Sequence, residues 1–162
     1  MLLDRTGEIQ DHWPRIAAEA PIPTEGRALI DLARLNEAPE GLSLGVHVPN
    51  DIDPHSLLGH LPRLSLISVD FPSFADGRGF SIGKCLRMLG FAGRLRASGP
   101  VISDQFTYLL QVGFDEVWVP ESVAARQPVE HWMAQPGLVT LGYQRDAEGR
   151  GSILDRRWAD HD

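Results

Sequence analysis

The chain has 162 residues, of which 43% are hydrophobic and 23% charged, and a net charge of −7. This length suits one globular domain, and the composition excludes wholesale disorder. No run of about 18 apolar residues occurs, which excludes a transmembrane helix. The acidic charge disfavours nucleic acid as a partner, and the single cysteine, Cys85, excludes an internal disulfide. With no signal-peptide pattern at the start, we expect a cytoplasmic protein that binds no membrane.

The first 40 residues are expected to form an irregular segment packed on the domain, because four prolines interrupt its short apolar runs. Within residues 1–40 the pattern favours a short helix over 11–20 and a strand over 28–32.

From residue 42 onward, strand-like and helix-like patterns alternate. Strands are predicted over 42–48, 64–69, 94–97, 116–119 and 138–141. Helices are predicted over 54–61 with Asp53 as N-cap, over 80–89 with Gly90 as the stop, from 103 or 104 to about 113, and over 120–134. This alternation predicts one α/β domain over 41–145. Its mainly parallel sheet of four to five strands is either open or a partial barrel, and a charged tail follows over 146–162.

Basic side chains gather in the middle of the chain. Between residues 63 and 105 there are six basic and three acidic side chains, a net charge of +3, whereas the remainder carries −10. Arginine dominates this set, and its guanidinium group binds carboxylate, phosphate and sulfur oxyanions through two parallel hydrogen bonds. The sequence therefore predicts an Arg-rich edge that suits an anion.

The stretch Asp-Gly-Arg-Gly-Phe-Ser at residues 76–81 looks most like a binding site. It follows a predicted strand, and ligands of parallel α/β proteins bind beyond the carboxyl ends of the strands. The candidate anion-binding residues come from this stretch and from two later arginines: Gly77, Arg78, Ser81, Arg87 and Arg96. A structural alternative stays open, in which Asp76 or Ser81 caps the following helix and Arg78 pairs with Asp76 or Asp70.

Two carboxylates are candidates for general acid or base work, Asp70 directly after a strand and Asp104 at the start of a helix. Their alternatives are a loop cap or an ion pair with Arg96 for Asp70, and capping by Asp104 together with Gln105. No residue pattern matches a metal site or a flavin or nicotinamide site, so neither metal nor cofactor is predicted. His47, His55 and His60 lie near one another in sequence, but the i, i+5 spacing of His55 and His60 does not put both on one helix face.

Aromatic residues add two expectations. Phe71 and Phe74 interrupt a loop that should be polar, so they either attach the loop to the core or form an exposed patch for a partner. Phe114 and Trp118 are predicted to belong to the core.

The sequence between residues 71 and 115 carries a long ordered pattern: FPSFADGRGFS at 71–81, LR at 86–87, GF at 90–91, GRLRA at 93–97, DQ at 104–105 and GFD at 113–115. This pattern resembles the bacterial family called domain of unknown function 934, and the resemblance covers about residues 43–120. It singles out Asp76, Gly77, Arg78, Ser81, Arg87, Arg96, Asp104 and Gln105. This chain has Gly83-Lys84 where the family often has Ala-Arg.

Members of that family are commonly encoded beside the haem-type sulfite reductase and the adenylyl-sulfate reductase of cysteine biosynthesis. The resemblance therefore implies an accessory protein of assimilatory sulfate or sulfite reduction, which binds a sulfur oxyanion or the sulfite reductase through the Arg-rich edge. One alternative is a stand-alone small-anion-binding enzyme with an Asp acid/base and an arginine clamp. Another is a structural module without a ligand. The oligomeric state and the presence of any reaction stay open.

Overall fold

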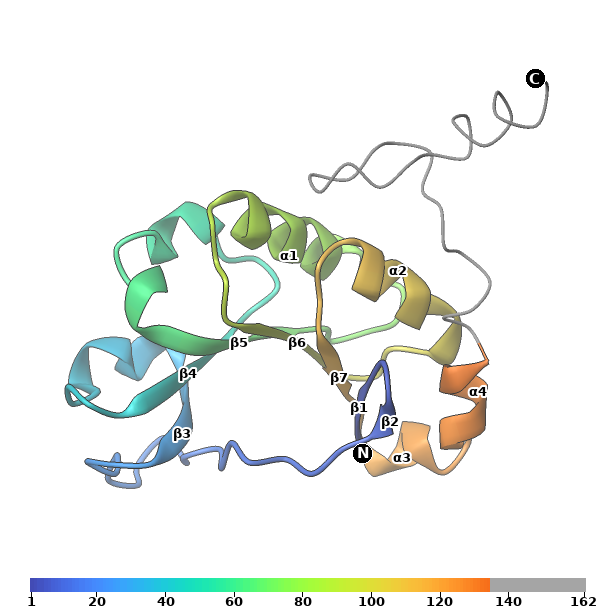
Figure 1. The fold of residues 1–162 in the computed structure, drawn as a ribbon, viewed down its shortest axis with the longest axis horizontal. Helices are drawn as coiled ribbons and strands as arrows, with labels where there is room; N and C mark the ends of the chain where they lie inside the picture. Colours follow the sequence, from blue (N-terminus) through green and yellow to red (C-terminus); the bar gives the residue numbers. More distant parts are fainter. Residues whose placement is uncertain (135–162) are drawn as a thin grey trace, which may run out of the picture.

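The structure is a computed structural model that describes residues 1–134 (Figure 1). In this part of the chain seven strands form one sheet in the order β2-β1-β7-β6-β5-β4-β3. The strands are β1 (Leu2–Asp4), β2 (Gly7–Glu8), β3 (Arg27–Asp31), β4 (Ser43–Val48), β5 (Leu64–Asp70), β6 (Arg94–Ser98) and β7 (Glu116–Trp118). Strands β3 to β7 are parallel, whereas β1 runs antiparallel to β7 and β2 antiparallel to β1.

The mainly parallel α/β class is confirmed, and the expected count of four to five strands is too low. The five parallel strands are the predicted ones at 28–32, 42–48, 64–69, 94–97 and 116–119. The two additional strands, β1 and β2, have three and two residues, too few for a period-two pattern to stand out. The predicted strand at 138–141 and the predicted tail at 146–162 lie outside the described residues.

Helices and 3-10 turns connect the strands. They are η1 (Leu32–Glu37), η2 (Pro54–Leu57), η3 (Leu61–Arg63), α1 (Arg78–Met88), η4 (Ser103–Gln105), α2 (Phe106–Gln111), α3 (Glu121–Ala124) and α4 (Val129–Met133). The predicted helix at 54–61 is two short 3-10 turns, and the Asp53 carboxylate caps the first by accepting from His55 N. The predicted helix at 120–134 is divided into α3 and α4, because Pro128 stands in extended conformation before α4 and fits only a helix start.

The predicted helix at 11–20 is wrong. Residues 9–16 are mostly extended and run along the sheet, where Leu29 N donates to Pro14 O and Ile16 N donates to Leu29 O, both at 2.9 Å. Pro14 lacks an N–H, and the neighbouring backbone groups bond to β3 instead of to a helical turn. Figure 1 shows this segment on one side of the sheet and α1 and α2 on the other.

The order of the parallel strands explains this division. Strands β3 to β7 stand side by side in chain order, so every crossover advances in the same direction, and right-handed crossovers then lie on one face. This is the winding of a barrel, but the sheet is open, with β2 and β3 at its ends.

The face under the helices is the main core. Every second strand residue on this face is fully buried and apolar: Ile30, Val46, Val48, Ile67, Val69, Leu95, Ala97 and Val117. Each buried Val, Leu or Ile side chain among them contributes roughly 1.5–3 kcal/mol of hydrophobic free energy relative to exposure. The intervening residues face the other side of the sheet, which we call the open face. Within residues 1–134 no helix is long and apolar enough to span a bilayer.

Candidate functional site

The loop that carries the family pattern joins β5 to α1. The Asp76 carboxylate accepts from Asn50 Nδ2 at 2.7 Å and from Arg78 Nη2 at 2.7 Å. Gln105 donates from Nε2 to the carbonyl of Phe74 at 2.8 Å. Hydrogen bonds from Arg78, first of all, hold the pKa of Asp76 well below its usual range. Residues from the turn after β4, from α1 and from η4 thus fix one loop.

The same loop presents an aromatic side chain. Phe71 is buried and its ring lies edge-on to Phe80 at 5.2 Å and to Phe114 at 5.8 Å. Phe74, three residues later, is 56% exposed, and Tyr108 on α2 is 52% exposed with its ring 4.9 Å from Phe80. Gln105, the residue before α2, holds the Phe74 backbone beside that helix, and we call Phe74, Phe80 and Tyr108 together the aromatic patch. Phe71 therefore attaches the loop to the core and Phe74 faces solvent.

Acidic residues from elsewhere in the chain neutralise much of the central basic segment. Arg87 donates to the Asp115 carboxylate and to three carbonyls, those of Phe91, Gly93 and Gly113. These four hydrogen bonds join α1 to the starts of β6 and β7. Arg94 pairs with Glu116 at 2.6 Å. Ser81 is exposed in the first turn of α1, and Gly77 stands at its N-cap. The edge of the sheet is consequently less cationic than the sequence suggests.

A second arrangement lies on the open face. The strand register places one residue of each parallel strand in a single row, in the order Asp31, His47, Ser68, Arg96 and Glu116. All five are polar, at positions where a sheet covered by a further layer normally carries apolar residues. A second row, two residues nearer the carboxyl ends, contains Asp70, Ser98 and Trp118.

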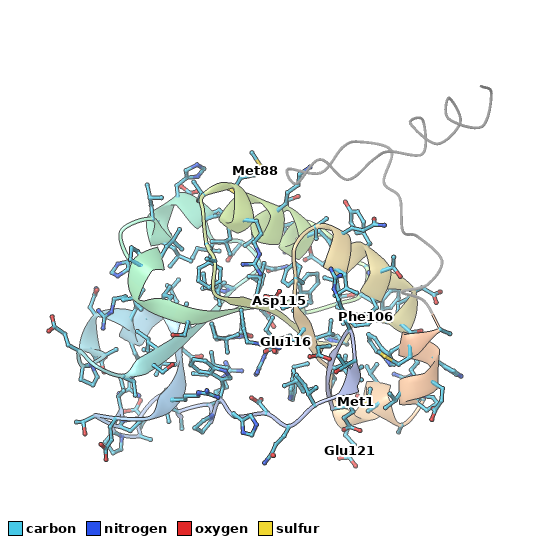
Figure 2. All side chains as sticks on the ribbon, in the orientation of Figure 1. Met1, Met88, Phe106, Asp115, Glu116 and Glu121 are labelled. Carbon is cyan, nitrogen blue, oxygen red and sulfur yellow. The ribbon has the colours of Figure 1, made fainter. Side chains whose placement is uncertain are left out.

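Arg96 is the centre of the first row. It is 2% exposed, as is Glu116, and its Nε donates to Glu116 Oε1 at 2.7 Å (Glu116 is labelled in Figure 2). Its two terminal nitrogens donate to the two carboxylate oxygens of Asp11, both at 2.9 Å. The predicted alternative of an Asp70–Arg96 ion pair is not what the structure shows: Asp70 Oδ1 lies 4.0 Å from His47 Nε2, and the ion pairs of Arg96 are with Asp11 and Glu116.

His47 lies at the middle of β4 and contacts β5. Its Nδ1 is 3.1 Å from the buried Ser68 hydroxyl, and its Nε2 is 4.0 Å from Asp70 Oδ1. Burial lowers the pKa of His47, and so do the charges of Arg15 and Arg96, against the opposing effects of Asp70 and Asp31. The imidazole is therefore neutral at pH 7 and able to accept a proton.

A cleft of about 400 Å³ opens on this face. Its walls are the N-terminal segment and the sheet, and they include Asp11, Trp13, Arg15, His47, Arg96, Ser98 and Trp118. Trp118 was predicted to be core, but it is 38% exposed, because the β7 register puts it on the open face beside Ser98. Trp13 packs over Gly45, where an added Cβ would lie 3.1 Å from its ring, and this holds the segment on the sheet.

The sequence-predicted acids fall in different places. Asp70 belongs to the open face, whereas Asp104 lies in the first turn of η4. Sequence reasoning considered His47 only as a possible metal ligand, and it missed Ser68, Glu116 and Asp11. Comparing alternate positions of successive strands would have found His47, Ser68 and Glu116, because each strand has a polar residue there. Within residues 1–134 no group of three His, Cys, Asp or Glu side chains is placed to hold a metal ion.

Comparison with known proteins gives one match. The model of the family described as bacterial protein of unknown function (DUF934) matches residues 45–154, about two thirds of the chain. No curated protein and no solved structure matches significantly. The match includes the motif loop, α1, and the strands β5 to β7 that carry most of the open-face rows. The chain therefore belongs to the DUF934 family of bacterial proteins.

Proposed function

We propose that this protein is an accessory protein of assimilatory sulfite reduction that docks on the sulfite reductase through the aromatic patch. The observation that carries the proposal is that residues of the family pattern hold one loop and that this loop exposes an aromatic side chain. Residues of that pattern hold the β5–α1 loop in place: Asp76 accepts hydrogen bonds from Asn50 and Arg78, and Gln105 of η4 donates to the Phe74 carbonyl. The loop presents the Phe74 side chain to solvent.

Physical chemistry favours this surface for a protein partner. Aromatic side chains are enriched at protein interfaces and often dominate their binding energy. A loop that is already fixed loses little conformational entropy on binding, so more of the contact energy becomes affinity.

The choice of partner rests on the family resemblance, which associates such chains with the haem-type sulfite reductase. This proposal places the contact with the reductase on the aromatic patch and not on the Arg-rich edge that the sequence predicts. Arg78 pairs with Asp76, and Arg96, which pairs with Asp11 and Glu116, is only 2% exposed, so the surface of a partner protein cannot reach it. By contrast, Phe74 and Tyr108 of the aromatic patch are exposed.

The test combines genetics with copurification. A strain lacking this gene should grow poorly with sulfate as the sole sulfur source and normally with cysteine. A tagged wild-type chain should restore growth and copurify with the sulfite reductase, and Phe74→Ser should do neither. Met88→Ser is the matched control, because Met88 is 78% exposed on the outer side of α1 (Figure 2). Normal growth of the deletion strain together with no copurifying reductase would overturn the proposal.

A further inference from the structure

We propose that the cleft on the open face binds a small organic anion, whose anionic group replaces the Asp11 carboxylate on Arg96. This site is separate from the aromatic patch and does not depend on the docking function.

Arg96 has the geometry of an anion receptor. Its guanidinium group offers two terminal nitrogens side by side, and each donates to one oxygen of Asp11 at 2.9 Å. This two-point contact is the one that guanidinium groups make with carboxylates, sulfates and phosphates. The Nε bond to Glu116 at 2.7 Å and the position in the sheet keep the group in place.

Asp11 is the replaceable half of the pair. Its side chain is 34% exposed, against 3% for that of Arg96. It belongs to the stretch between β2 and β3, and its further bond is a local one from Trp13 N at 2.9 Å. A fixed, buried cation therefore faces a carboxylate on an irregular segment. A ligand that brings its own pair of oxygens can exchange with Asp11 without moving the sheet.

The charges around the cleft explain why exchange is needed. Arg15 pairs with Asp31 at 2.9 Å, and Arg96 already has two acidic partners. Asp70 adds a further carboxylate at the carboxyl edge. With its positive groups matched by acidic ones, the cleft offers an incoming anion no unpaired guanidinium. Binding of an anion to Arg96 therefore requires that the Asp11 carboxylate leaves.

The size of the cleft indicates that the anion carries an organic part. A volume of about 400 Å³ is in the range of small-molecule sites and far exceeds one sulfate or phosphate ion. Trp118 supplies a half-exposed ring at the wall, which suits a planar or apolar group. His47 and Ser98 supply hydrogen-bonding groups beside it. The ligand class is thus an organic carboxylate, sulfonate, or phosphate or sulfate ester.

The first experiment replaces the resident carboxylate by free anions. Asp11→Ala is melted with increasing sodium acetate, sulfate or phosphate against chloride at matched ionic strength, while tryptophan fluorescence is followed. We expect an oxyanion to raise the Tm of Asp11→Ala by several degrees in a saturable way. The anion concentration that gives half of the rise should be at least tenfold higher for wild type. Asp53→Ala, which removes an exposed carboxylate elsewhere, should respond like wild type.

The second experiment tests the organic part. Benzoate and phenyl phosphate should bind Asp11→Asn at least tenfold more tightly than acetate and phosphate do, and Trp118→Ala in the same background should abolish the difference. Asp11→Asn retains the shape of the side chain, so it also serves if Asp11→Ala does not fold. Equal responses of the Asp11 variants and Asp53→Ala would overturn the anion site. Equal affinities for aromatic and inorganic anions would overturn the assigned ligand class.

Discussion

Removing Glu116 should destabilise the protein more than any exposed charge would. Its carboxylate is buried and accepts from Arg96 Nε and Arg94 Nε, both at 2.7 Å. Removing one partner of a buried ion pair typically costs about 3–5 kcal/mol, because the other charge is left uncompensated. Here Arg94 is half-exposed and can be hydrated, and Arg96 keeps Asp11. We therefore expect the lower end, about 3 kcal/mol, for Glu116→Leu.

Urea unfolding followed by circular dichroism measures this cost, and Tm should fall by about 6–12 °C for a chain of this size. The double variant Arg96→Met/Glu116→Leu should lose less stability than Glu116→Leu, because apolar residues of similar volume can replace a buried pair at little cost. A cost below about 1 kcal/mol for Glu116→Leu, or a double variant equal to the sum of the single ones, would refute the buried cluster as described.

Three further outcomes are expected. Gly83→Ala should lower the free energy of unfolding, measured in urea, by about 1 kcal/mol. The added methyl group overlaps the buried Phe114 ring, and the cost of overpacking, about 1–3 kcal/mol, exceeds the gain of about 1 kcal/mol in helix propensity. A variant more stable than wild type would contradict this. The folded pKa of His47 lies below its usual 6.5, so the unfolded chain takes up protons first as pH falls. Tm should therefore drop as pH falls through 6.5, and less steeply in His47→Gln; parallel curves would contradict the lowered pKa. Asp76→Asn should speed trypsin cleavage after Arg78, since the loop loses charged hydrogen bonds; an unchanged rate would mean that Asp76 does not hold the loop.

The sequence predicts much of this fold for a simple reason. Strands such as β5 are apolar runs bounded by turn residues, and the spacing between them leaves room for one crossover each. The 11–20 helix fails because its backbone bonds to β3, a tertiary contact with no local signal. The strands β1 and β2 are too short to carry a pattern.

The candidate site is less predictable, because register decides it. Asp70 follows from the rule that ligands bind beyond strand ends, whereas Arg96, in the middle of β6, is named from the clustering of arginines and from the family resemblance. Their neighbours on the open face come from other strands and from the N-terminal segment, up to 85 residues away for Asp11 and Arg96. The register of the sheet pairs β4 with β5 so that His47 lies beside Ser68. No single stretch of sequence contains both residues or their pairing. The sequence leaves open whether Phe74 packs in the core or lies on the surface. In the structure the hydrogen bond from Gln105 to the Phe74 carbonyl holds the loop with the Phe74 side chain exposed.

The most direct measurement of the central claim is the affinity of the purified chain for the purified sulfite reductase of the same cell, by sedimentation velocity and isothermal titration calorimetry. The account predicts a complex with wild type and with Met88→Ser of equal affinity, and at least tenfold weaker binding by Phe74→Ser at unchanged Tm. No complex with wild type, or equal binding by Phe74→Ser, would contradict it.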